Sequence, residues 1–344
     1  MLYNYLKVAI RNLKRNALFS FINIIGLALS MSVCLIALSV IRNAFTYDNF
    51  HPYPQRTYRI VTEVTGKNGN SERWATAPLP LAQQLRGNYS FVENLTAVYT
   101  AISSEMSYGE KAIGVEGAFA DPSFFKVFGF ELLYGDKITA LAKPNSIVLT
   151  EETAALFFKA GENPVGKIVS LKQLGSAFIV TGVIKNSQQK THLSQKVYAS
   201  MSTVPALEAE KKLEPLIESW KNYGAASIYM LVKENTHERA VQQALTGIAS
   251  TTFKQHPPQN IVQLRYDLQR LDHITAGEEL INGGNSVSRT TLLGIGGITL
   301  LILLMACFNY TNLSLARMLA RSKEVGIRKV IGGTRLQVFL QFIT

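Results

Sequence analysis

Few residues in this 344-residue chain combine the residue type and the spacing that chemistry needs. The segment 161–167, Gly-Glu-Asn-Pro-Val-Gly-Lys, has the glycines and the lysine of a phosphate-binding loop. Position 168 is isoleucine, so the hydroxyl that would bind Mg²⁺ is missing. The segment also follows an expected helix and precedes an expected strand, which reverses the order of the true motif. We therefore predict a turn here and no nucleotide site.

Serine, histidine and cysteine chemistry has as little support. Ser187 and Lys190 match the short Ser-x-x-Lys pattern of penicillin-recognising enzymes, but the motifs that accompany it are missing. The five histidines are scattered singly, without a His-x-x-x-His pair, which argues against a zinc site. Both cysteines, Cys34 and Cys307, lie inside apolar runs. The carboxylates are spread along the chain, which indicates solvated faces. We expect no catalytic residue, metal or cofactor, and no enzyme.

The positive charge is concentrated at the two ends of the chain. The formal net charge is +11; residues 1–41 hold four basic groups and no acid, and residues 313–344 hold six basic groups and one acid. A nucleic-acid-binding protein would gather its charge on a folded face with base-reading side chains, so we expect no nucleic-acid partner. Basic residues that flank apolar runs are instead typical of membrane topology signals.

Two uncharged apolar runs, residues 19–41 and 290–312, are long enough to cross a bilayer, since about 20 helical residues span its hydrocarbon core. The first exceeds the roughly 7–15 apolar residues of a cleavable signal peptide and has no Ala-x-Ala exit, so we expect a retained anchor. Residues 2–15 place apolar and basic side chains on opposite helix faces, as in an amphipathic helix at lipid head groups. The basic flanks put both chain ends in the cytoplasm and residues 45–289 outside.

The first apolar run also predicts helix packing. It carries small residues at helical spacing, namely Gly26, Ser30 and Ala37, with Ala28 and Ser32. Small residues let membrane helices approach closely. We expect this helix to pack against another membrane helix.

The long middle region has the patterns of an α+β domain. A strand, a helix and a strand follow one another near its start and again near its end. The first set covers residues 56–64, 78–86 and 92–107, and the second covers 225–233, 236–250 and 261–268. Two such units around a middle section predict one subdomain built from both ends and a second one inserted between them.

The middle section has its own local signals. Asp121 is the expected N-cap of a short helix over residues 121–128, with proline in its first turn. Thr150 is the expected N-cap of the helix 151–159, which follows a strand at 146–150. Residues 167–171 and 177–185 have the pattern of a hairpin around Leu174 and Gly175.

The basic stretch after the second apolar run has a distinctive residue order. It reads Lys323-Glu-Val-Gly-Ile-Arg-Lys329, followed by Gly332-Gly333 and a renewed apolar start at Leu336. An ordinary stop signal needs the charge but not this order. The order resembles the first cytoplasmic loop of MacB/FtsX-type ABC transporter permeases. Four further stretches resemble the extracytoplasmic domain of the same family: residues 47–58, 124–130, 146–158 and 163–168.

The resemblance implies that this loop docks on a separate cytoplasmic ATPase. The residues it assigns to that contact are Glu324, Gly326, Ile327, Arg328 and Gly332. It implies a non-catalytic permease subunit that couples ATP hydrolysis to movement of the extracytoplasmic domain, in export or another envelope process. The partners it implies are the ATPase, the lipid bilayer of the inner membrane, a second permease copy and an envelope protein.

The expected organisation is an α+β domain flanked by two transmembrane helices. In chain order it comprises a cytoplasmic amphipathic helix at 1–17, transmembrane helix 1 at 18–42, a MacB-like core domain at 45–289 (subdomain 1 from about 45–110 and 190–280, subdomain 2 at about 111–189), transmembrane helix 2 at 290–312, a coupling loop at 313–335 and the start of a third helix at 336–344. Family members have four transmembrane helices, or eight when duplicated, so the resemblance implies a fragment of a longer permease.

An alternative function is a two-span membrane sensor with an external ligand-binding domain. A sensor should continue after its second span into a heptad-patterned signalling helix. Here Gly326, Gly332 and Gly333 interrupt helix formation. A third class, a membrane-anchored hydrolase, is disfavoured by the missing catalytic motifs.

Overall fold

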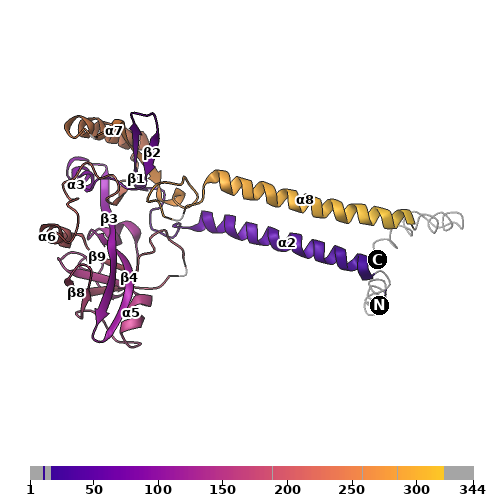
Figure 1. The fold of residues 1–344 in the computed structure, drawn as a ribbon, viewed down its shortest axis with the longest axis horizontal. Helices are drawn as coiled ribbons and strands as arrows, with labels where there is room; N and C mark the ends of the chain where they lie inside the picture. The colour runs from indigo at the N-terminus through magenta and orange to yellow at the C-terminus, as the bar shows by residue number, and fades with distance from the viewer. Residues whose placement is uncertain (1–10, 12–16, 188, 258, 285, 321–344) are drawn as a thin grey trace. The chain divides into compact units, whose positions relative to one another are not determined.

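The structure, a computed structural model, describes residue 11 and residues 17–187, 189–257, 259–284 and 286–320 (Figure 1). It contains two compact units, one formed by two long helices and the other by residues 44–289. The predicted architecture is confirmed, since two apolar helices flank a mixed α+β domain. Most of the expected amphipathic helix, and all of the expected third helix, lie outside the described residues.

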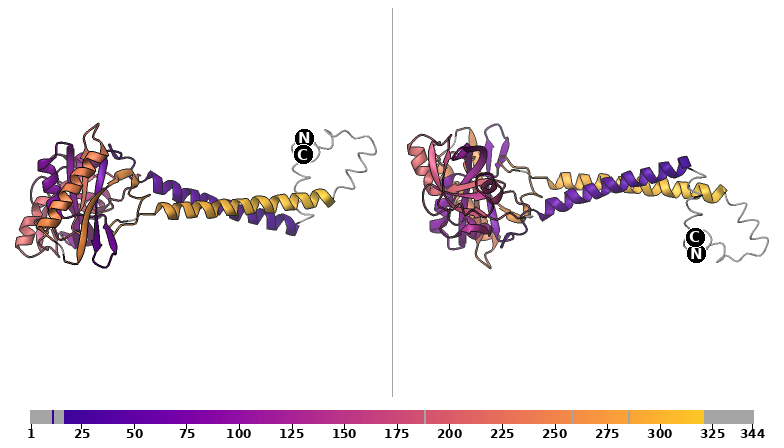
Figure 2. Two further views of the ribbon diagram at one scale, coloured as in Figure 1. Left: turned by 90° about the horizontal axis from the view of Figure 1, so that it is seen from above. Right: turned by 90° about the horizontal axis from the view of Figure 1, so that it is seen from below.

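The two long helices are α2, Ala17–Thr46, and α8, Arg289–Ala320. Within them, Phe21–Thr46 and Arg289–Asn312 are long and apolar enough to cross a membrane, with mean hydropathies of 2.6 and 2.4. The helices run antiparallel to each other (Figures 1 and 2).

Small residues line the side of α2 that is least exposed. Gly26, Ser30 and Cys34 are half-buried there and Ala37 is buried, and the Sγ of Cys34 lies 3.9 Å from the carbonyl oxygen of Thr299 on α8. A side chain added at Gly26 would meet nothing within 4 Å among the described residues, so close packing through Gly26, Ser30 and Ala37 stays a prediction. Ala28 and Ser32 are exposed on the other side of the helix.

An 11-stranded sheet forms the centre of the domain. Its order is β11-β1-β10-β3-β4-β9-β6-β8-β5, with β2 paired to β1 and β7 paired to β3 and β8. The strands are β1 Thr57–Gly66, β2 Ser71–Trp74, β3 Val92–Tyr108, β4 Lys111–Ala120, β5 Leu132–Gly135, β6 Ser146–Thr150, β7 Ile168–Leu171, β8 Ser176–Ile184, β9 Val197–Ser200, β10 Ser227–Val232 and β11 Ile261–Arg270. The shorter helices are α3 Leu79–Asn88, α4 Phe124–Phe128, α5 Glu151–Phe157, η1 Met201–Thr203, α6 Val204–Ala209, α7 Glu238–Gln255 and η2 Leu271–His273.

The two predicted strand–helix–strand units are confirmed. They appear as β1-α3-β3 and β10-α7-β11, and their four strands are neighbours in the order β11-β1-β10-β3. All pairs within this group are antiparallel. The two ends of the domain's chain therefore build one part of the sheet together. The division of the domain into two subdomains stays a prediction.

Local signals in the middle section are mostly confirmed. The Thr150 Oγ1 accepts the backbone N–H of Thr153 at 3.3 Å and caps α5, and β7 and β8 form the predicted hairpin. The segment 161–167 is a turn region between α5 and β7. The prediction for Asp121 is wrong. Helix α4 starts at Phe124, and the Asp121 carboxylate instead accepts the backbone N–H of Ala97 at 2.8 Å and an N–H of Arg86 at 2.9 Å.

The sheet has a buried core on each face. Alternate residues of a strand point to opposite faces, and β1 shows this clearly. Ile60 belongs to the larger core cluster, together with Leu245 of α7 and Tyr266 of β11. On the opposite face Tyr229 of β10 packs with Phe128 of α4 in the second cluster. The polar groups described next lie on this second face.

Candidate functional site

The predicted ATPase contact lies outside the residues that the structure describes. This holds for Glu324, Gly326, Ile327, Arg328 and Gly332 alike. The described part of a candidate site is found where the domain's chain connects to the membrane helices. We call residues 47–51, which follow α2, the first linker, and residues 275–284, which precede α8, the second linker.

Asp48 anchors the first linker inside the domain. It comes two residues after the end of α2, has a φ of 60° and is fully buried. Aspartate is one of the few side chains that tolerate this left-handed backbone. Its N–H donates to the carbonyl of Lys190 at 3.0 Å, and its Oδ1 accepts the backbone N–H of His192 at 3.2 Å. The chain that leaves α2 is thus tied to a loop 144 positions later.

Two histidine rings flank the Asp48 carboxylate. The Nδ1 of His192 lies 2.9 Å from Oδ2 of Asp48, and its Nε2 lies 2.7 Å from the hydroxyl of Tyr229. The Nε2 of His51 lies 3.3 Å from Oδ1 of Asp48, and its Nδ1 lies 2.7 Å from the carbonyl oxygen of Phe128. The side chains of all three members are at most 5 % exposed.

The Asp48 carboxylate is charged although it is buried. Burial alone would raise the pKa of Asp48, but the contacts with His192 and His51 outweigh burial and hold that pKa well below its usual range. Burial lowers the pKa of His192 against the pull of Asp48, so this ring is neutral at neutral pH and accepts the Tyr229 O–H. The Nε2 of His51 also lies 3.5 Å from the hydroxyl of Thr191. The cluster is therefore a buried carboxylate held between two imidazole rings, of which the His192 ring is neutral.

Arg59 extends this polar group toward the second linker. On β1, Arg59 lies opposite Tyr229 of β10 and Gln269 of β11, so the three side chains share one face. The guanidinium is buried, and it donates to Oε1 of Gln269 at 2.6 and 3.1 Å and to the carbonyl of Gly283 at 3.4 Å. Burial lowers the pKa of Arg59, but an arginine remains charged in proteins.

A single β-bridge holds the second linker at the edge of β2. Ile281 pairs in parallel with Trp74. The N–H of Ile281 donates to the carbonyl of Arg73 at 3.0 Å, and the N–H of Ala75 donates to the carbonyl of Ile281 at 2.9 Å. The Ile281 side chain is 41 % exposed, so apolar burial adds little to the bridge.

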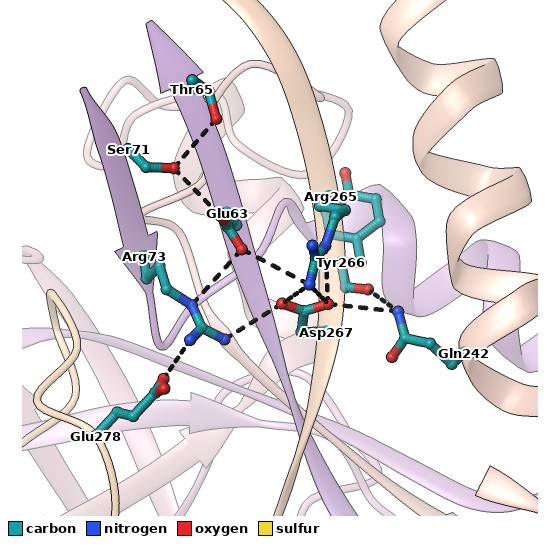
Figure 3. A network of polar contacts seen from close by, with 9 residues as sticks. All are labelled: Glu63, Thr65, Ser71, Arg73, Gln242, Arg265, Tyr266, Asp267 and Glu278. Atoms are coloured by element: carbon teal, nitrogen blue, oxygen red, sulfur yellow. Dashed lines mark hydrogen bonds and ion pairs between the residues drawn. The ribbon is translucent and has the colours of Figure 1, made fainter. Parts of the chain in front are cut away.

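Arg73 is the centre of a charged network beside this bridge (Figure 3). Its guanidinium lies 2.5 Å from Glu278 of the second linker, 3.2 Å from Asp267 on β11 and 3.8 Å from Glu63 on β1. Arg265 lies 2.8 Å from Asp267 and 3.9 Å from Glu63.

Strand register explains this arrangement. Glu63 is paired with Arg73 on β2 and with Arg265 on β11, so a negative charge stands between two positive charges in one row across the sheet. Opposite charges on directly facing residues stabilise a sheet modestly. Unlike the Asp48 cluster, this network is open to solvent, with the side chains of Arg73 35 % and Glu278 61 % exposed.

Neither group has the parts of a catalytic or metal site. Among the residues that the structure describes, no group of three or more His, Cys, Asp or Glu side chains is arranged to hold a metal ion. Asp48, His192 and Tyr229 have the order of an acid–base relay, but burial raises the pKa of Tyr229, and its ring is packed against Phe128 in the core. The arrangement is suited to holding chain segments in place.

Reasoning from the sequence missed the Asp48 cluster. The expectation that the carboxylates lie on solvated faces is wrong for Asp48, because two histidines and two backbone contacts replace water around it. A signal was present, since Asp48 and His51 lie three residues apart directly after an apolar run. The remaining histidines, His237, His256 and His273, are not part of this cluster.

A family model and curated relatives agree on the kind of protein that this chain resembles. The model of the family described as "MacB-like periplasmic core domain" matches residues 20–248. YvrN, an uncharacterised ABC transporter permease of Bacillus subtilis (strain 168), is 26% identical over 65% of this chain and 51% of its own. The macrolide export ATP-binding/permease protein MacB of Shewanella sp. (strain ANA-3) is 24% identical over 74% of this chain and 36% of its own. The chain thus spans about half the length of the first relative and less of the second.

A solved structure supports the fold. A domain of a putative permease protein from Porphyromonas gingivalis superposes with a TM-score of 0.53 at 19% sequence identity. The superposition covers 64% of this chain and 91% of that one.

Proposed function

Since this chain belongs to the family of the MacB-like periplasmic core domain, we propose that it acts as the membrane permease part of an ABC transporter. It is a membrane protein with an extracytoplasmic domain. The observation that carries the proposal is the extent of the family match, which begins inside α2 and continues through most of the domain to residue 248.

The energy in this proposal comes from a separate cytoplasmic ATPase. The ATPase binds the loop around Glu324, Gly326, Ile327, Arg328 and Gly332, whose residue order supports the assignment. The positive charge of the loop suits an acidic surface on the ATPase, and Ile327 suits an apolar cleft. ATP binding and hydrolysis then move the membrane helices, and the two linkers pass that motion to the extracytoplasmic domain. The chain itself performs no catalysis.

The proposal includes further contacts within the membrane and outside it. Only 6% of an apolar 18-residue window in each candidate span is buried in the described part of the chain, so α2 and α8 have apolar surface left for lipid and for more helices. A second permease copy would cover part of that surface. The complex is placed in the inner membrane, where it exports a substrate or acts with an envelope partner protein.

The test is co-purification of the full-length permease with its ATPase. The substitution Arg328→Glu should break pairing with acidic groups on the ATPase, because a buried interface charge facing a like charge costs about 2–5 kcal/mol. That is a loss of affinity of roughly 30-fold or more. The control is Lys137→Glu, which makes the same charge change at an exposed position of the domain.

The possible outcomes separate the assignments. Loss of the ATPase with Arg328→Glu, but not with Lys137→Glu, supports the docking loop. Equal retention by both variants means that the loop is only a topology signal. If the wild-type chain binds no ATPase, the permease proposal fails and the two-span sensor becomes the better account.

A further inference from the structure

The second linker is positioned to respond directly to α8. Its last residue, Gly284, precedes the first residue of α8, Arg289, by five positions. Five residues span at most about 18 Å even when fully extended, so a larger displacement of α8 must pull on the linker. The backbone bond from the N–H of Val287 to the carbonyl of Thr275, 2.8 Å long, closes the linker into a loop at its base.

We propose that the second linker is a releasable latch, whose residues 278–283 leave the edge of β2 during the transport cycle while the first linker stays buried. This inference rests on the proposed function, because α8 must move for the latch to open. It goes beyond that function by naming the joint that opens and the joint that does not.

Opening of the latch leaves no buried charge without a partner. When Glu278 leaves, Arg73 keeps Asp267 at 3.2 Å and Glu63 at 3.8 Å, so no buried charge loses all its partners. Glu278 itself is already mostly exposed and becomes hydrated. An exposed ion pair of this kind contributes little to stability and is easily broken.

The contact at Gly283, at the other end of the latch, can also break without leaving a charge unpaired. Arg59 donates to the carbonyl of Gly283 over a long 3.4 Å contact, but it donates to Gln269 over 2.6 and 3.1 Å. After release of Gly283 the guanidinium therefore keeps its stronger partner. Both arginines that hold the latch are fixed to the sheet by other residues. They therefore keep their positions whether the latch is closed or open.

Opening uncovers backbone groups at the end of β2 and at the residue that follows it. The carbonyl of Arg73 and the N–H of Ala75 lose their hydrogen bonds to Ile281 and become free edge groups of a sheet. Ala75 is fully buried in the closed state. A label that reacts at position 75 therefore reports the open state.

The experiment measures maleimide labelling of single cysteines in the full-length chain, reconstituted in lipid with its ATPase. The natural cysteines are removed by Cys34→Ala and Cys307→Ala. Ala75→Cys reports opening of the latch, and Ala199→Cys, fully buried on the central strand β9, reports general unfolding. Each reporter is measured without nucleotide and with ATP.

A matched pair of substitutions tests the ion pair. Glu278→Gln removes the charge that holds the latch to Arg73, and Glu279→Gln removes the neighbouring exposed charge, which lies outside the network of Figure 3. We expect Glu278→Gln to raise the labelling rate at position 75 by about 1.4- to 5-fold, the range that an exposed pair allows. Glu279→Gln should leave the rate unchanged, and ATP should raise the rate at position 75 but not at position 199.

Any of three results would overturn the inference. The first is equal labelling rates in the two glutamate variants, and the second is a joint rise of the rates at positions 75 and 199. The third is an unchanged rate at position 75 with ATP although the ATPase is bound and active. Failure of the ATPase to bind at all would instead count against the proposed function. The comparison of the glutamate variants without nucleotide still decides in that case whether the linker opens.

Discussion

The two linkers join the same domain to two similar apolar helices, yet different kinds of interaction hold them in place. The first linker places Asp48 in the core, between two histidines and against backbone groups of a distant loop. The second linker lies at the edge of a four-residue strand and is held by one bridge, one exposed ion pair and a long contact from Arg59 to Gly283. The two are connected through one face of the sheet, since Arg59, which contacts Gly283, is paired on β1 with Tyr229, whose hydroxyl meets His192.

This difference determines how strongly each linker is held and how easily it can be released. A buried charge that loses its partner is left without water, so a buried cluster resists opening strongly. An exposed pair exchanges its partner for water at little cost, so it forms and breaks readily. Under the proposed function, the first linker is the fixed attachment of the domain and the second linker is the one that yields.

The prediction with the largest expected effect is that the domain folds without the two membrane helices. Residues 44–289 contain both linkers and a core on each face of the sheet. We expect this fragment to be soluble and to unfold cooperatively, with chelator and reductant present. Circular dichroism during heating measures this. A gradual transition would mean that the linkers hold nothing together by themselves.

Removal of the first-linker charge should have the largest effect among single substitutions. Asp48→Asn keeps the shape and the left-handed backbone that asparagine also tolerates, but it removes the buried carboxylate charge that the two histidines and the backbone N–H of His192 stabilise. Loss of buried hydrogen bonds to a charged group costs about 1.5–3 kcal/mol. Urea unfolding of the fragment should show this loss. A change below about 1 kcal/mol would make the two linkers alike and break the comparison.

Acid should weaken the first linker before it affects the second. Burial holds the pKa of His192 below its ordinary value of 6.5. The unfolded chain therefore binds a proton at this residue below about pH 6.5, while the folded chain does not until a lower pH. The contribution of His192 to stability is thus complete above that pH and is lost as the pH falls, by up to about 1.4 kcal/mol per pH unit. The charged groups that act on this ring are Asp48, His51 and Arg59.

The pH effect can be assigned by comparing two histidine variants. His192→Gln removes the buried ring, so the slope of unfolding free energy between pH 6.5 and 5 should become shallower. His273→Gln changes a ring whose side chain is 45 % exposed and should leave the slope unchanged. Equal slopes in both variants would show that the Asp48 cluster is not the pH-dependent part of the domain.

Removal of the second-linker charge should have the smallest effect. Glu278→Gln should lower the unfolding free energy by about 1 kcal/mol or less, because the pair is exposed. The difference from wild type should shrink further in 1 M salt, where charges are screened within about 3 Å. The effect of Asp48→Asn should persist in the same salt. If both effects respond to salt equally, the distinction between buried and exposed linkers is lost.

Local patterns in the sequence predicted much of the fold, and distant contacts account for what they missed. The units β1-α3-β3 and β10-α7-β11, the Thr150 cap and the β7–β8 hairpin depend on neighbouring residues, and each was predictable from periodicity and capping. The Asp48 cluster depends on contact with His192, 144 positions away.

Register decides the rest of the candidate site. Glu63 meets Arg73 and Arg265 only because of the way three strands are aligned, and a shift of one residue would turn each side chain to the other face. The sequence pattern contains no such alignment. The bridge between Ile281 and Trp74 likewise joins a segment without strand periodicity to a strand of four residues.

The most direct test of the two-linker account is amide hydrogen exchange on the full-length protein. The amides of Asp48 and His192 hold the first linker, and those of Ala75 and Ile281 hold the second. We predict that the second pair exchanges through local opening, much faster than the first pair, which exchanges only when the domain unfolds. Equal protection of the two pairs, or faster exchange at Asp48 and His192, would contradict the account.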